Sequence, residues 1–216
     1  MVLMKKADLG LSEVVSSVLV LTMVILAITL IALIVLPIMG ENDERVHNGD
    51  VLIEFANMKA DVDTAWLSND TGVTRQAVFT LSPFGDKTEI TMFPNLFGVL
   101  SSGTVSLKHG ADNFNPEGDG GVTYVPVIIT YTASNMYADD IELVYSGEDG
   151  GSLSQNSNNI LPGSEINGEG SYIIVVKASD EEQSLGGNEI ITLEYRLDTI
   201  VPYGSDHLCV FDMVLR

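Results

Sequence analysis

Residues 11–39 read LSEVVSSVLVLTMVILAITLIALIVLPIM, and this stretch decides how the chain is organised. From Val14 to Met39 there are 26 residues without a charge, interrupted only by four hydroxyl side chains and Pro37. A helix of this length is about 39 Å long, against roughly 30 Å of hydrocarbon in a bilayer. Because a helix in a soluble core rarely stays apolar on every face over such a length, the stretch predicts a membrane-spanning helix.

The flanks of the apolar stretch predict its orientation. Lys5 and Lys6 precede it, whereas Glu41, Asp43 and Glu44 follow it. The positive-inside rule then places the N-terminus in the cytoplasm and everything after about residue 40 outside the cell. The run is far longer than the apolar region of a secretory signal peptide and has no small-residue cleavage site after it. We therefore expect the helix to stay attached to the mature protein.

The net charge of −20 lies almost entirely beyond the apolar stretch, where 28 Asp and Glu face 8 Lys and Arg. Such a surface repels nucleic acid and anionic lipid, so we expect no nucleic-acid partner. The single cysteine, Cys209, excludes an intrachain disulfide. Its place in the strand-like LCVFDMVL predicts a small buried hydrophobic residue.

The chain divides into four expected zones. They are a cytoplasmic leader (1–10), the apolar helix (11–40), an amphipathic helix or stalk (41–68) and an acidic β-rich extracellular domain (69–216). Pro37 and Gly40 predict a kink or an end of the apolar helix near the outer membrane surface. Asn48-Gly49 is expected to separate it from the second helix.

The second helix carries one apolar stripe at spacings of three and four, formed by Val51, Phe55, Met58, Val62 and Trp66. Its other face is expected to carry Glu54, Lys59, Asp61 and Asp63. The stripe is consistent with packing on the following domain or with a contact between subunits.

From Val73 onward the pattern changes to short segments rich in Val, Ile, Thr and Tyr, separated by Gly- and Asn-rich turns. The expected strands are Gln76–Leu81, Glu89–Phe93, Thr104–Lys108, Thr123–Thr132, Ile141–Tyr145, Ser171–Lys177, Glu189–Leu197 and Leu208–Leu215. They predict an all-β, antiparallel, sandwich-like or barrel-like ectodomain, so that the chain is α+β as a whole.

Signs of chemistry are weak. The three histidines are isolated, and no catalytic or nucleotide-binding motif is present, so we expect no enzyme and no catalytic residues. Asp112, Asn115, Glu117 and Asp119 are explained first as solvated turns of an acidic protein, with a structural calcium ion bound by their oxygen atoms as the weaker alternative; no other cofactor is expected. Asn69 begins the one N-x-S/T sequon and is a candidate glycosylation site.

The N-terminus, KKADLG followed by LSEVV, resembles the class III signal peptide of archaeal type IV pilin-like proteins. In that family a membrane aspartic protease, the prepilin peptidase, removes the basic leader on the cytoplasmic side. The resemblance implies cleavage between Gly10 and Leu11, although Leu9 stands where the family places a basic residue. It also implies a pilin-like lollipop architecture and identical or related pilin subunits as partners.

Glu13 would then be the third residue of the mature chain. A carboxylate at the membrane boundary tends to need a partner, which a neighbouring subunit's N-terminal ammonium could supply during assembly. Alternatively, Glu13 lies among the headgroups at a helix N-terminus, where an anion is favoured.

Two functions remain open on the sequence alone. The chain is expected to be a structural subunit of an archaeal type IV pilus-like surface filament, assembled through its apolar helix. The alternative is a single-pass, membrane-anchored protein that does not polymerise and whose extracellular domain binds a partner or contacts the S-layer. Both place the domain beyond residue 40 outside the cell, on the membrane or in an extracellular filament.

Overall fold

The computed structural model describes residues 3–83, 101–116, 120–148, 150–164 and 172–216. Side chains are described from Glu13 onward, Leu36 excepted. The chain forms two compact units, Met1–Asn42 and Asp43–Arg216.

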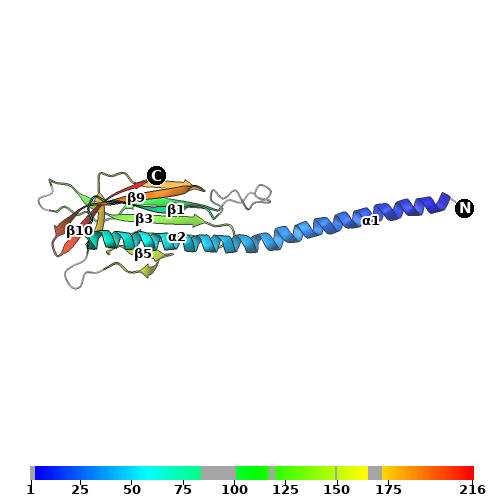
Figure 1. Ribbon diagram of the computed structural model, residues 1–216, viewed down its shortest axis with the longest axis horizontal. Helices are drawn as coiled ribbons and strands as arrows, with labels where there is room; N and C mark the ends of the chain where they lie inside the picture. Colours follow the sequence, from blue (N-terminus) through cyan, green and yellow to red (C-terminus); the bar gives the residue numbers. More distant parts are fainter. Residues whose placement is uncertain (1–2, 84–100, 117–119, 149, 165–171) are drawn as a thin grey trace. The chain divides into compact units, whose positions relative to one another are not determined.

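The first unit is helical. It contains α1 (Leu3–Leu30), a π-helical segment (Ile31–Val35) and the start of α2 (Leu36–Leu67) (Figure 1). Pro37 lacks an N–H, and its ring crowds the carbonyl four residues earlier, which a wider π-helical turn can relieve. Pro37 therefore accompanies a local change of helical geometry, and the backbone stays helical beyond Gly40.

The second unit begins within α2, whose apolar stripe packs against the sheet. Val51, Phe55, Met58 and Val62 are buried and Trp66 is partly buried, which confirms the packing predicted from their spacing. The expected break at Asn48-Gly49 is wrong, since the helix runs through both residues. A helical glycine costs only about 1 kcal/mol, which this buried stripe can offset.

Ten strands are described. They are β1 (Thr74–Thr80), β2 (Ser102–His109), β3 (Tyr124–Ser134), β4 (Ile141–Ser146), β5 (Ser152–Gln155), β6 (Asn158–Leu161), β7 (Tyr172–Lys177), β8 (Gln183–Gly187), β9 (Ile190–Tyr203) and β10 (Asp206–Leu215). Seven predicted strands correspond to β1, β2, β3, β4, β7, β9 and β10, whereas Glu89–Phe93 lies outside the described residues. The sequence pattern did not predict β5, β6 and β8, which are short and contain few apolar residues.

The strands form one curled, mixed sheet in the order β1-β9-β10-β7-β3-β4-β5-β6, with β2 pairing β3 and β8. The expectation of a wholly antiparallel, sandwich-like domain is thus correct only as far as a β-rich domain, because β7 and β10 pair in parallel. The long strand β3 explains the curl. Its first residues, Tyr124–Pro126, pair with β7, whereas 128–133 pair with β4, so one strand belongs to both halves of the sheet.

The core lies between α2 and the concave side of this sheet. Its largest fully buried side chains include Tyr131, Tyr145, Tyr172 and Tyr195. Phe55 of α2 contacts Phe79 of β1 with ring centroids 4.9 Å apart. Cys209 is buried in β10, as predicted. The hydroxyls of Tyr131, Tyr172 and Tyr195 also form hydrogen bonds with polar side chains of α2.

Candidate functional site

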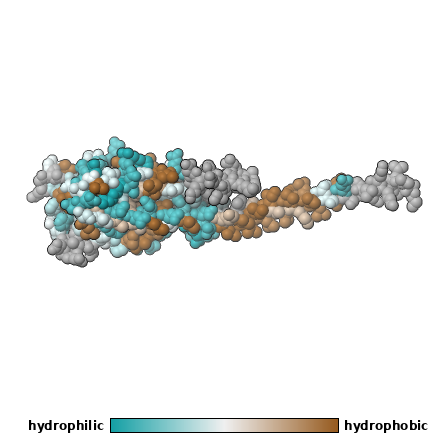
Figure 2. Space-filling model, in the orientation of Figure 1, coloured by the Kyte–Doolittle hydropathy of each residue, from teal (hydrophilic) through white to brown (hydrophobic). Residues whose placement is uncertain are grey.

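The apolar helix presents its side chains outward on every described face. From Val14 to Leu30 every residue is exposed, and Leu33 in the π-helical segment is 71% exposed. Figure 2 shows this segment as a continuous apolar surface. By length and composition the helix is able to cross a membrane, as the sequence predicted.

Three hydroxyls within the apolar helix hydrogen-bond to the helix itself. Ser17, Thr22 and Thr29 donate to the carbonyl oxygens three or four residues earlier, each at 2.8 Å. A hydroxyl left unpaired in hydrocarbon would cost several kcal/mol. These three side chains therefore need no water to satisfy their hydroxyls.

The predicted processing and assembly residues lie in this helix. Gly10 and Leu11 fall within the helical backbone of α1, and the Glu13 side chain is exposed. No contact of Glu13 tests its pairing, so cleavage after Gly10 and the role of Glu13 stay predictions.

In the second unit the carboxylate of Glu44 is fully buried and attaches α2 to the sheet. Its Oε1 accepts hydrogen bonds from the Ser101 hydroxyl and from the N–H of Met136 (2.9 Å). Its Oε2 accepts from the N–H groups of Tyr137 (2.8 Å) and Ala138 (2.6 Å). The three successive N–H groups belong to the turn between β3 and β4, which strand pairing would otherwise leave without acceptors.

These contacts keep Glu44 ionised. Burial by itself raises the pKa of the Glu44 carboxyl. The hydrogen bonds from Ser101 and the three backbone N–H groups together lower the pKa by more than burial raises it, so the pKa lies below its ordinary value of 4.5. The site is therefore an anion enclosed by donors, and it fixes the turn against the first part of α2 in this unit.

One turn along α2, His47 is buried with Nε2 3.2 Å from the hydroxyl of Tyr131. Burial lowers the pKa of His47, although the nearby Asp50 carboxylate raises it in part. Burial also raises the pKa of Tyr131 to about 12. Both groups are therefore neutral at pH 7, and this contact is an uncharged hydrogen bond between helix and sheet.

Lys59 and Asp63 form a second polar cluster near the C-terminal end of α2. Lys59 Nζ lies 2.8 Å from Asp63 Oδ2 and donates to the Ser164 hydroxyl at 2.9 Å. Ser164 and Tyr172 in turn donate to the Asp63 carboxylate. Trp66 stacks on the ring of Tyr172 with centroids 4.5 Å apart, so an aromatic pair adjoins the cluster through the Tyr172 hydroxyl.

The assignment of Lys59 to a solvent-facing surface of α2 is wrong, because its residue is only 6% exposed. Glu54 and Asp63 are half-buried and bond the sheet, whereas Asp61 is exposed but still accepts a hydrogen bond from Tyr195 at 3.2 Å. Glu54, Asp61 and Asp63 therefore contact the sheet, and the buried Lys59 contacts Asp63 and Ser164.

The two candidate modification and metal sites lie outside the helix. Asp112 is exposed, Asn115 accepts a hydrogen bond from Thr123 at 2.8 Å, and Glu117 and Asp119 lie outside the described residues. Within the described ranges no three His, Cys, Asp or Glu side chains gather as metal ligands do. The calcium site stays a prediction.

Asn69 is exposed and has a φ of 49°. Its N–H donates to the Trp66 carbonyl at 3.1 Å, which ends α2 in a left-handed residue of the kind that asparagine tolerates. This role accounts for Asn69 without a glycan, and glycosylation stays a prediction.

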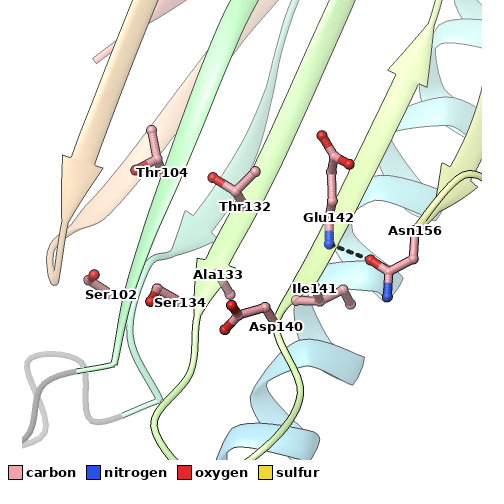
Figure 3. Close-up of a pocket in the computed structure, with 9 residues that line it drawn as sticks. All are labelled: Ser102, Thr104, Thr132, Ala133, Ser134, Asp140, Ile141, Glu142 and Asn156. Atoms are coloured by element: carbon pink, nitrogen blue, oxygen red, sulfur yellow. Dashed lines mark hydrogen bonds between the residues drawn. The ribbon is translucent and has the colours of Figure 1, made fainter.

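A surface groove of about 390 Å³ lies over β2, β3 and β4 (Figure 3). Hydroxyls of Ser102, Thr104 and Thr132 line it together with the carboxylates of Asp140 and Glu142. The amide oxygen of the lining Asn156 accepts a hydrogen bond from the Glu142 N–H at 2.8 Å. The described residues that line the groove include no histidine, lysine or cysteine.

Comparisons with protein-family models, with curated proteins and with solved structures found no match for this chain.

Proposed function

We propose that this chain is a structural subunit of an archaeal type IV pilus-like surface filament, assembled through its N-terminal apolar helix. The observation that carries the proposal is the helix surface between Val14 and Leu30, which is apolar and exposed on every side. Such a surface is stable only when lipid or other apolar side chains cover it. Before assembly the membrane would cover it, and afterwards the helices of neighbouring subunits would.

The polar contacts of α2 support the same proposal. A subunit that leaves the membrane must keep its domain attached to its helix while that helix changes surroundings. The buried Glu44 carboxylate and the Lys59–Asp63 cluster fix the part of α2 from Asp43 onward to the sheet at two separate points. That part of the helix therefore moves with the domain as one body.

The resemblance of the leader adds the assembly route. A prepilin peptidase would cut between Gly10 and Leu11, leaving the apolar helix at the mature N-terminus. The domain beyond the helix would lie outside the cell, first at the membrane and then on the filament.

The test is to purify surface material from cells that make the chain, image it for filaments and sequence the N-terminus of the protein. We expect filaments that contain this chain, beginning at Leu11. Gly10→Val should block cleavage, since a bulky residue fills the space that the protease reserves for a small one, and filaments should disappear. A mature chain that begins at Met1 and remains in the membrane would reject the filament and favour the anchored binding protein.

A further inference from the structure

The outward side of strands β1, β9 and β10 is a sheet face that α2 does not cover. Along β9 the residues alternate, so that Leu193, Tyr195 and Leu197 are buried while the side chains between them point outward. We call this outward surface the β9 face. It is defined by Val78, Ile190, Glu194, Arg196, Asp198 and Asp212, together with Lys177 and Arg216, whose side chains form ion pairs with these carboxylates.

The charges on the β9 face compensate one another. Arg196 lies 3.1 Å from Asp198 and 3.2 Å from Asp212. Lys177 extends to Asp198 at 3.6 Å, and Arg216 lies 3.1 Å from Glu194. Three cations therefore face three carboxylates, and the face is neutral although the chain carries −20. The excess negative charge lies on other surfaces.

The same face exposes two apolar side chains on neighbouring strands. Val78 of β1 is 48% exposed and Ile190 of β9 is 54% exposed. Val78 pairs with Thr192 and Ile190 with Thr80, so the two apolar residues are diagonal neighbours in the sheet. A contact between proteins combines apolar residues with a polar rim, and this apolar pair beside compensated charges offers both.

We propose that the β9 face is a docking surface for a second copy of this chain, an inference that rests on the proposed filament. At physiological ionic strength charges are screened beyond about 8 Å, so the charges within a contact decide whether two acidic copies repel. The β9 face can meet another copy without a net like-charge penalty. A strongly basic partner would instead prefer the acidic surfaces, and anionic lipid would be repelled by them.

The first test adds one charge to the apolar pair of the face. Ile190→Glu in the full-length chain breaks no ion pair of the face but makes it negative. We expect at least a tenfold drop in filaments per cell, reversed in part when assembly occurs at higher salt. The matched control is Ile160→Glu in β6, where the same exposed residue type changes outside the face and filament number should stay as in the wild type.

A second pair of variants tests the charge balance itself. Arg196→Glu should lower filament number, whereas Lys108→Glu, the same charge change at an exposed position in β2, should not. Tryptophan fluorescence of each detergent-purified chain shows whether the domain is folded. Folded Ile190→Glu and Arg196→Glu chains that assemble as well as their controls would overturn the docking face but leave the filament standing. A wild-type chain that forms no filaments and no cross-linked oligomers in membranes would overturn both.

Discussion

The N–H of Ala138 donates a 2.6 Å hydrogen bond to the carboxylate of Glu44, although the two residues are 94 positions apart in the chain. The hydrogen bond therefore joins α2 to the turn between β3 and β4, two parts of the chain that only the fold brings together. Because the carboxylate also satisfies two adjacent N–H groups and a hydroxyl, its loss would leave several buried donors without an acceptor.

Glu44→Gln is therefore expected to lower the free energy of unfolding by about 2–3 kcal/mol, since hydrogen bonds to a charged group are among the stronger ones. Trp66, the one tryptophan of the chain, stacks on Tyr172 and reports the loss of helix–sheet packing by fluorescence during a urea titration in detergent. Asp43→Asn is the control, because it removes the same charge from an exposed neighbour. Equal urea midpoints for both variants would contradict the role of Glu44.

The stabilisation by the Glu44 carboxylate should also depend on pH. The folded pKa of Glu44 lies below the ordinary 4.5, so the unfolded chain takes up this proton at a higher pH than the folded chain does. The stabilisation is then fully present above about pH 4.5 and is lost as the pH falls through the folded pKa. The difference in unfolding free energy between the wild type and Glu44→Gln should shrink on acidification below pH 4.5. A difference that stays constant down to acid unfolding would argue against the buried carboxylate.

Asp63→Asn should destabilise the domain more than Lys59→Met. The first change leaves the buried Lys59 ammonium without its anionic partner, and breaking such a pair typically costs about 3–5 kcal/mol. The second leaves Asp63 half-buried with hydrogen bonds from Ser164 and Tyr172. Urea titrations of both single variants and of the double variant give the coupling between the two charges. A smaller loss for Asp63→Asn than for Lys59→Met would show that the ammonium finds solvent or another acceptor.

The α2 stripe was predictable from sequence because its spacing of three and four residues depends only on helical geometry. The prediction that Lys59 lies opposite the apolar stripe is wrong because it followed from the charge of Lys59 and not from its angular position around the helix axis. It stands four residues after Phe55 and three before Val62, both buried, and that spacing puts it on the same face. Glu44 carried no comparable signal, since its N–H partners lie at 136–138 and only the fold brings them near.

In the sheet, too, the strands with a local hydrophobic pattern were predictable from sequence, whereas the pairing between strands was not. Alternation in β9 was visible because its residues from Ile191 to Leu197 bury one face, whereas β10 was visible as an apolar run in which Leu208 to Phe211 are all buried. The sequence did not predict the parallel pairing of β7 with β10 or the pairing of β3 with both β4 and β7. The register of a strand and the choice of its neighbour depend on contacts between residues that are distant in sequence. The polar strands β5 and β6 showed no alternation that a reading of hydrophobic periods could detect.

Gly49→Ala should stabilise the domain by about 0.5–1 kcal/mol, because a helical glycine pays the largest backbone entropy on folding. A Cβ at Gly49 would meet no atom within 4 Å, so nothing opposes this gain. Gly147→Ala is the opposite case, since its Cβ would clash with the backbone carbonyl oxygen of Ile174. Thermal unfolding followed by Trp66 fluorescence should shift upward for the first variant and downward for the second. A downward shift for Gly49→Ala would indicate that α2 needs a weak point at Asn48-Gly49.

Glu13→Gln tests the residue that the apolar helix carries at its start. If the carboxylate pairs with the Leu11 ammonium of a neighbouring subunit during assembly, the variant should insert and be cleaved normally but form far fewer filaments, because one charge of a poorly solvated pair would lose its partner. Glu13→Asp is the matched control, since it keeps the charge and should restore part of the filament number. N-terminal sequencing of both variants separates an assembly defect from a processing defect. Wild-type filament numbers from Glu13→Gln would place the Glu13 carboxylate among the headgroups, where a helix N-terminus favours an anion but assembly does not depend on it.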